Sequence, residues 1–413
     1  MLYFVDFSTA RNLNRFSSAI LLIVLIGASV VLAGCNVTMD FWEDDNAVRP
    51  APLIEFEPQV EIKEIWEQDV GPGTRGLHVK LTPVVQAGRL FVATAEGEVH
   101  AYDAKTGEVL WETETEIPIR GGPGIGDESV LVGSSDGELL ALSQDNGNIL
   151  WKARVSSEIL TTPREKDGIV IVRTVDGKLF GLNHEDGTRR WIYDRSVPAL
   201  TLRGISTPVI VGDLVIAGFD GGQLVAVSIE NGYAVWEKYI AMPRGRSDIE
   251  RMVDIDGEIV VLENAVYVVT FQGHVAAVDV VSGNIFWRRK MSSYAGLGAY
   301  THTLYVTDEK SHVWALNRYT GETLWNQMEL ERRNLTAPVG FRQMGFGEYV
   351  VVGDFEGYIH LLDTDDNGQV IARTRVDKKG ILTPPIIAQD DILYVYGNSG
   401  TLTALQIMDK EPE

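Results

Sequence analysis

The stretch LFVATAEGEVHAYDAKTGEVLW, residues 90–111, decides the fold because it recurs along most of the 413-residue chain. Close copies occupy residues 130–151 and 169–191, and each joins two short apolar segments through a polar turn before ending on a tryptophan. Further copies end at Trp236, Trp287 and Trp325. A repeat of about 40 residues is typical of propeller or solenoid architectures.

Apolar and polar residues alternate inside each copy, as in Glu98-Val99-His100-Ala101-Tyr102. This period of two predicts half-buried strands and excludes amphipathic helices. An Asx or Ser residue stands four positions before a glycine in six copies, which predicts a tight hairpin turn. The pairs are Asp103 and Gly107, Ser143 and Gly147, Asn183 and Gly187, Ser228 and Gly232, Asp279 and Gly283, and Asn317 and Gly321.

Two imperfect copies complete the set. Residues 349–372 form a seventh copy with Ala372 in the tryptophan position, and residues 392–406 form an eighth that lacks its last strand. The stretch around Trp66 supplies that strand. The sequence therefore predicts an all-β, eight-bladed β-propeller of four-stranded antiparallel blades over residues 59–408, followed by a tail at 409–413. The N-terminal outer strand joins the C-terminal blade and closes the ring, and the tryptophans pack between blades.

The N-terminus has the features of a lipoprotein signal peptide. Two arginines precede the apolar run at residues 19–32, and Leu32-Ala33-Gly34-Cys35 resembles the lipobox of bacterial lipoproteins. The resemblance implies a signal peptide at residues 1–34 and acylation of Cys35, with Asn36 favouring the outer membrane by analogy. Residues 35–58 are acidic and aperiodic and are expected to form a flexible lipidated tether.

Composition and motifs argue against several kinds of site. The net charge of −22 disfavours nucleic acid as a partner. The seven histidines lack metal-ligand spacing, and the stretch from Asp363 to Gly368 resembles half of a calcium loop but has Thr374 where a glutamate is needed. We expect a hairpin turn there, an inner strand at Gly121–Gly126, and neither metal nor cofactor.

The repeat is interrupted twice, at residues 192–206 and again between Trp236 and Trp287. The first interruption holds Leu200, Leu202 and Arg203, a combination of apolar groups and a guanidinium that is typical of protein interfaces. From the period alone, the leucines could equally face the blade interior.

The tryptophan repeat also resembles that of the pyrroloquinoline quinone (PQQ) dehydrogenases, which are periplasmic eight-bladed propellers. Those enzymes commonly carry a vicinal disulfide and long insertions. This chain has a single cysteine and little room for insertions. A PQQ-dependent dehydrogenase and a propeller that binds a small ligand therefore remain alternatives.

The lipobox, eight repeats and the segment LTLRG at residues 200–204 together resemble the BamB family, the propeller lipoproteins of the outer-membrane β-barrel assembly (Bam) machinery. The resemblance implies a non-enzymatic scaffold, lipid-anchored on the periplasmic face of a Gram-negative outer membrane. It implies that Leu200, Leu202, Arg203, Asp254 and Asp256 bind the barrel subunit BamA. A further hypothesis is that strand edges receive unfolded outer-membrane proteins.

Overall fold

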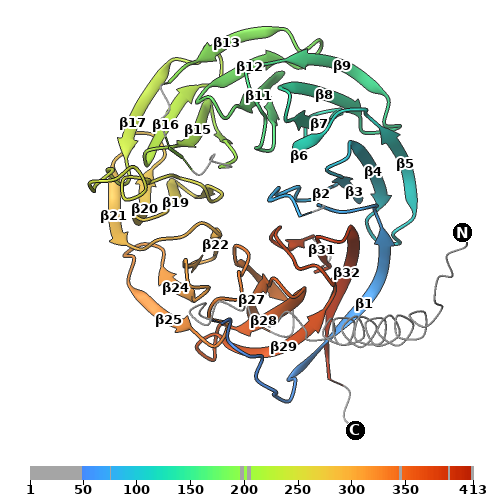
Figure 1. Cartoon of the computed structure of the whole chain (residues 1–413), viewed down its shortest axis with the longest axis vertical. Coiled ribbons are helices and arrows are strands. Elements are labelled where there is room, and N and C mark those ends of the chain that lie inside the picture. The colour runs from blue at the N-terminus through green and yellow to red at the C-terminus, as the bar shows by residue number, and fades with distance from the viewer. Residues whose placement is uncertain are drawn as a thin grey trace, which may run out of the picture. The chain divides into compact units, whose positions relative to one another are not determined.

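Eight four-stranded antiparallel sheets stand around a common axis within residues 50–413 (Figure 1). This computed structural model describes residues 49–74, 76–195, 200–201, 206–343, 347–388 and 391–410. All regular secondary structure in those ranges is β-strand, and none of it is a helix long and apolar enough to cross a membrane. The predicted eight-bladed propeller is confirmed.

Blades 1 to 7 each use four consecutive strands, ordered from the axis outward. Blade 1 has β2 (Val84–Gln86), β3 (Arg89–Ala93), β4 (Glu98–Asp103) and β5 (Val109–Glu114); blade 2 has β6 (Ile119–Ile125), β7 (Ser129–Ser134), β8 (Glu138–Ser143) and β9 (Ile149–Arg154); blade 3 has β10 (Arg164–Lys166), β11 (Ile169–Arg173), β12 (Leu179–Asn183) and β13 (Arg189–Tyr193). Blade 4 has β14 (Val209–Val211), β15 (Leu214–Phe219), β16 (Gln223–Ser228) and β17 (Ala234–Tyr239).

The remaining blades follow the same plan except for the last. Blade 5 has β18 (Val260–Leu262), β19 (Ala265–Val269), β20 (His274–Asp279) and β21 (Ile285–Lys290); blade 6 has β22 (Gly296–Tyr300), β23 (Thr303–Thr307), β24 (Val313–Asn317) and β25 (Thr323–Gln327); blade 7 has β26 (Val339–Gln343), β27 (Gly347–Gly353), β28 (Tyr358–Asp363) and β29 (Gln369–Arg375). Blade 8 joins β30 (Ile386–Ile387), β31 (Leu393–Tyr396) and β32 (Thr401–Asp409) to β1 (Val60–Asp69).

The ring closes through hydrogen bonds between the two ends of the propeller. Strand β1 pairs antiparallel with β32 from Val60 opposite Asp409 to Asp69 opposite Thr401, with a bulge between Glu64 and Trp66. Figure 1 shows β1, in blue, as the outermost strand beside β32, in dark red. The predicted closure is confirmed, and it removes the open edges that a linear array would leave.

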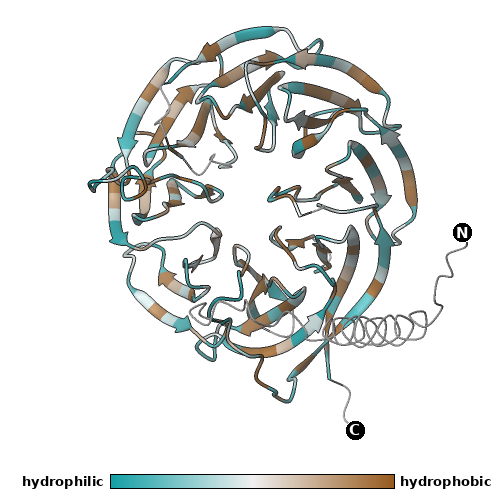
Figure 2. Ribbon diagram, in the orientation of Figure 1, coloured by the Kyte–Doolittle hydropathy of each residue, from teal (hydrophilic) through white to brown (hydrophobic). Residues whose placement is uncertain are grey.

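The core lies between neighbouring blades. Middle strands such as β4 are buried on both faces, whereas outer strands such as β5 alternate exposed and buried residues. Figure 2 shows this difference as apolar colour along the middle strands and alternating colours on the outer ones. Val99 of blade 1 and Leu140 of blade 2, for example, belong to one apolar cluster. Neighbouring blades therefore share one apolar core at each seam.

The outer-strand tryptophans dock on the turn of the following blade. Trp66 Nε1 donates to the carbonyl of Ala104 at 3.1 Å, and a Cβ on the turn residue Gly107 would lie 2.7 Å from the Trp66 ring. Five more tryptophans donate across a seam in the same way: Trp111 to Gln144 (2.8 Å), Trp151 to His184 (2.6 Å), Trp191 to Ile229 (2.8 Å), Trp236 to Val280 (2.9 Å) and Trp287 to Arg318 (2.8 Å). The predicted packing between blades is confirmed.

The structure also explains why the seventh copy carries Ala372 in place of tryptophan. Blade 8 draws its outer strand from the N-terminus, so it has no hairpin between its third and fourth strands. A tryptophan in blade 7 would lack the glycine turn on which the others dock. Ala372 is instead buried in the cluster that contains Val60 and Ile371.

Residues 50–58, expected to belong to a flexible tether, pack against blades 6 and 7. Ala51 N donates to the Glu331 carbonyl at 2.9 Å, and the Arg373 guanidinium lies 5.3 Å from the centre of the Phe56 ring. Leu53 and Phe56 are partly buried against the apolar cluster of these blades. The composition suggested a solvated chain, but these two apolar side chains pack on the propeller, and the carbonyls of Ala51 and Ile54 accept hydrogen bonds from arginines of the propeller.

Two motifs lie in the positions that the repeat predicted. The Asp363 carboxylate accepts a hydrogen bond from Asp365 N at 2.8 Å, within the hairpin turn between β28 and β29. Residues 119–125 form the inner strand β6, where a Cβ on Gly124 would lie 2.0 Å from the carbonyl oxygen of Pro163. The glycines there allow close approach of the neighbouring blade.

Candidate functional site

The two interrupted connectors open on the same face of the propeller. Strands of a blade alternate in direction, so the turn between its second and third strands lies at the same end as the connector that leaves its outer strand. We call this end the connector face. The interrupted connectors, residues 194–208 and 240–259, flank blade 4, so Leu200 on the first connector and the two aspartates on the second lie at adjacent seams.

The first connector presents an apolar residue to solvent. The Leu200 side chain is 42% exposed, which contradicts the alternative that it fills the blade interior. Leu202 and Arg203 lie outside the described residues. Leu200 is thus available for a contact with another protein.

The second connector separates its two aspartates. Asp256 is partly exposed and lines a cavity on the axis. Asp254 is only 1% exposed, and its carboxylate accepts a hydrogen bond from Gly221 N at 2.9 Å. The Asp254 carboxylate is therefore used inside the protein to fix the β15–β16 turn, and a direct contact between either aspartate and a partner stays a prediction.

A buried arginine, which the sequence analysis missed, lies beside these aspartates. Arg173 ends β11 and is 1% exposed; its Nη2 lies 3.9 Å from Asp220 Oδ1. Burial lowers the Arg173 pKa, and the charges of Asp220, Asp256 and Asp254 oppose that effect. The arginine of blade 3 thus interacts with the acidic β15–β16 turn and with the second interrupted connector.

The repeat itself carried a signal for Arg173. The residue in the equivalent position of the ladder, at or next to the end of the second strand, is Ala93 in blade 1, Gly133 in blade 2 and Val269 in blade 5. A charged residue among small or apolar equivalents indicates a special local environment.

An aromatic ring connects blades 3 and 4 at the same place. Phe219, the last residue of β15, has the Arg173 guanidinium carbon 5.3 Å and the Arg195 guanidinium carbon 6.0 Å from its ring centre. Arg195 also lies 3.7 Å from Glu237 on the outer strand of blade 4. Such contacts are favourable when the cation is shielded from water. They join Arg195, at the start of the first connector, to blade 4.

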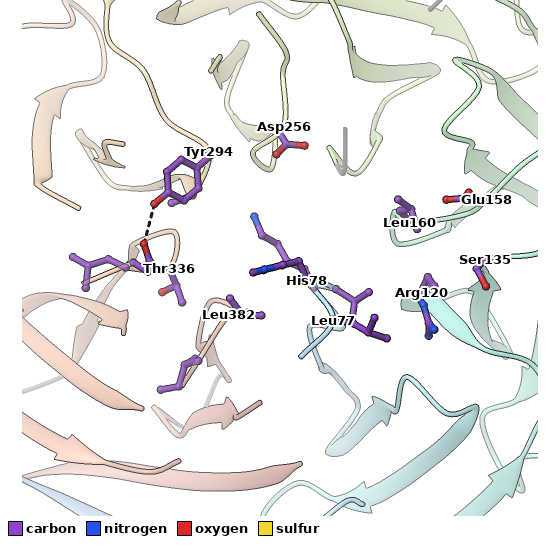
Figure 3. A pocket seen from close by; sticks show the side chains of 16 residues that line it. Leu77, His78, Arg120, Ser135, Glu158, Leu160, Asp256, Tyr294, Thr336 and Leu382 are labelled. Atoms are coloured by element: carbon purple, nitrogen blue, oxygen red, sulfur yellow. Dashed lines mark hydrogen bonds between the residues drawn. The ribbon is translucent and has the colours of Figure 1, made fainter. Parts of the chain in front are cut away.

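A cavity of about 650 Å³ occupies the axis on this face. Figure 3 shows that its labelled side chains come from blades on all sides, with His78 reaching toward the middle. Asp256 and Glu158 contribute carboxylates, and Lys80 and Arg120 contribute cations. Tyr294 Oη, on the connector that enters blade 6, donates to Asn334 Oδ1, on the connector that leaves blade 6, at 3.2 Å. Among the described residues, no three His, Cys, Asp or Glu side chains are grouped so as to hold a metal ion.

Comparison with known proteins agrees with this architecture. The family model described as outer membrane protein assembly factor BamB matches residues 63–151 and 114–327. A curated BamB from Pseudomonas aeruginosa is 46% identical over 383 residues, which cover 93% of this chain and 98% of the relative. The chain belongs to the BamB family.

Other members and solved structures extend the comparison. A BamB from Yersinia pestis is 34% identical over 394 residues, covering 93% of this chain and 98% of that protein. The crystal structure of BamB from Moraxella catarrhalis superposes with a TM-score of 0.75 at 27% identity, covering 84% of this chain and all of that one (100%). These matches confirm the family resemblance that the lipobox, the repeats and LTLRG indicated.

The quinoprotein likeness concerns the fold alone. A quinohemoprotein alcohol dehydrogenase from Comamonas testosteroni has a TM-score of 0.67 at 14% identity, covering 85% of this chain and 77% of that one. At this level of identity the two chains share a propeller architecture. The dehydrogenase alternative gains no support from this match.

Proposed function

We propose that this chain is a non-enzymatic scaffold of the outer-membrane protein assembly machinery that binds its barrel subunit, BamA, through the connector face. The partner-binding surface comprises Leu200, Leu202, Arg203 and Asp256. The observation that carries the proposal is the exposed Leu200 on the connector next to that of Asp256, in a chain of the BamB family. Assembly of outer-membrane proteins is the role in the names of its relatives.

Contacts at the turns next to this surface support the proposal. Arg173, Phe219 and Asp254 hold the neighbouring turns from inside. A preorganised surface loses little conformational entropy on binding. Buried residues that fix the turns position the contact residues without touching the partner. Asp254 and Arg173 are therefore positioning residues in this proposal.

In this proposal, a lipid anchor at Cys35 holds the surface in the periplasm. Acylation of Cys35 would attach the chain to the periplasmic face of the outer membrane, and several acyl chains at about 0.8 kcal/mol per buried CH₂ would keep it there. Cys35 lies outside the described residues, so this part of the proposal rests on the lipobox.

Affinity capture of a tagged full-length chain from detergent-solubilised membranes tests the proposal. We expect the wild type to retain a large barrel-forming membrane protein and Arg203→Glu to lose most of it. Lys152→Glu, at an exposed position of blade 2, is the control and should behave like the wild type. Failure of the wild-type chain to retain any barrel protein would contradict the proposed function.

A further inference from the structure

Blade 5 carries a group of cations that departs from the acidic character of the chain. Acidic residues outnumber basic ones by 58 to 36. The outer strand β21 nevertheless reads IFWRRK, and the connector that leads into blade 5 contains PRGR at residues 243–246. Arg288 and Lys290 are exposed on β21, and Arg244 and Arg246 are exposed on the connector. We call these four residues the blade-5 basic surface.

The cations converge although they come from separate segments. Lys290 lies opposite His274 in the β20–β21 ladder, and Arg288 Nη1 donates to the carbonyl of Ile240, at the start of the connector, at 3.3 Å. Burial lowers the pKa of His274, and the positive charges of Arg288, Arg244 and Lys290 lower it further. The positive charges of these three residues thus act on the same side chain, that of His274.

Neighbouring carboxylates are engaged elsewhere. Asp248 pairs with Arg251, Glu250 accepts from the backbone nitrogens of Arg246 and Ser247, and Glu237 on the adjacent outer strand accepts from Gln223 at 2.8 Å. Within the described part of the chain, no cation of the blade-5 basic surface forms an ion pair. Its charge is available to an external anionic group.

The connector tip adds exposed apolar groups on a structured turn. Ser247 Oγ accepts from Glu250 N at 3.2 Å while Glu250 Oε2 accepts from Ser247 N at 3.3 Å, a reciprocal arrangement that stabilises one helical turn. This turn presents Ile249, 65% exposed, and Met242 is 61% exposed at the start of the connector. Arginine beside exposed apolar side chains is the composition of protein-interface hot spots.

We propose that the blade-5 basic surface, together with Met242 and Ile249, is a second contact site for the barrel subunit and binds an acidic, partly apolar patch on its periplasmic portion. The inference rests on the proposed function, because the same connector continues into Asp254 and Asp256. Continuity with that surface favours a protein partner. The net charge of −22 opposes approach to an anionic bilayer, which makes a lipid surface the weaker fit.

Titration of the detergent-solubilised barrel subunit against full-length variants tests the proposal. Arg288→Glu/Lys290→Glu is compared with Lys152→Glu/Arg154→Glu, which makes the same charge change at the equivalent outer-strand positions of blade 2. We expect the blade-5 variant to bind about tenfold more weakly, and with a smaller salt dependence, because opposite charges no longer meet across the interface. The blade-2 variant should match the wild type.

Three other outcomes of these binding measurements would overturn the inference. Wild-type affinity of the blade-5 variant, together with lost affinity of Arg203→Glu, would remove the second contact and leave the proposed function intact. Absence of binding by the wild type would remove both. A blade-5 variant that keeps its affinity but no longer sediments with phosphatidylglycerol vesicles would identify a membrane contact instead. Arg244→Glu/Arg246→Glu repeats the test without altering a strand, should the first variant fold poorly.

Discussion

The indole of Trp66 donates a hydrogen bond to the carbonyl of Ala104, which lies 38 residues further along the chain, at 3.1 Å. Tyr394, from the C-terminal part of blade 8, donates to the same oxygen at 2.8 Å. One carbonyl of blade 1 thus receives bonds from both ends of the chain that build blade 8. The ring is closed at this seam by side chains as well as by the β1–β32 ladder.

The docking glycines provide a test of this seam. Gly107 and Gly88 have nearly equal φ values of +74° and +76°, but only Gly107 faces the Trp66 ring. We expect Gly88→Ala to lower the free energy of unfolding by about 1–2 kcal/mol from left-handed strain alone. Gly107→Ala should cost about 1–3 kcal/mol more because its methyl group overlaps the ring. Urea denaturation measures both, and equal losses would argue against the docking contact.

The packed segment at residues 50–58 should resist proteolysis. Cleavage after Glu55 and Glu57 by a glutamate-specific protease requires the segment to leave the surface. Phe56→Ala removes the partly buried ring under Arg373 and should accelerate cleavage by about tenfold. Ile54→Ala, at a 57% exposed position, is the control. Cleavage of the wild type as fast as an unfolded peptide would show that the segment is not held.

The buried Arg173 should contribute strongly to stability. Arg173→Met removes the buried cation that interacts with the charges of Asp220, Asp254 and Asp256, and we expect it to lower the free energy of unfolding by about 3 kcal/mol. Adding Asp220→Asn should recover part of the loss, because one uncompensated charge is removed with it. Urea denaturation of single and double variants measures the coupling. Additive losses would show that the two residues do not interact.

Stability should fall below neutral pH partly because of His360. Its Nε2 lies 3.0 Å from Asp354 Oδ2 in a fully buried site; burial lowers the His360 pKa more than Asp354 raises it. The unfolded chain therefore binds a proton near pH 6.5 that the folded chain does not, and stability decreases as the pH falls below about 6.5. The slope from one such group is at most about 1.4 kcal/mol per pH unit.

Thermal denaturation between about pH 7.5 and 5.5 checks this expectation. His360→Gln should show a shallower pH dependence than the wild type. His78→Gln, at an exposed histidine in the axial cavity, is the control and should keep the wild-type dependence. A His360→Gln profile that is as steep as that of the wild type would assign the effect to other groups.

The sequence by itself determined the propeller, its blade number and its closure. Alternating residues, the turn from Asp103 to Gly107 and the docking tryptophan are local signals that repeat, so each copy reinforces the others. The resemblance carried by LTLRG led to the BamB family, and Leu200 is exposed as an interface residue would be.

Only the tertiary structure decided which charged residues are buried. Asp254 and Asp256 are two positions apart, yet one fixes a turn and the other lines the axial cavity, because the path of a connector depends on the blades beside it. Arg173, the docked Phe56 and the convergence of Arg244 with Lys290 likewise depend on segments distant in sequence. Repeat periodicity defines each blade, whereas contacts between blades define the environment of these side chains.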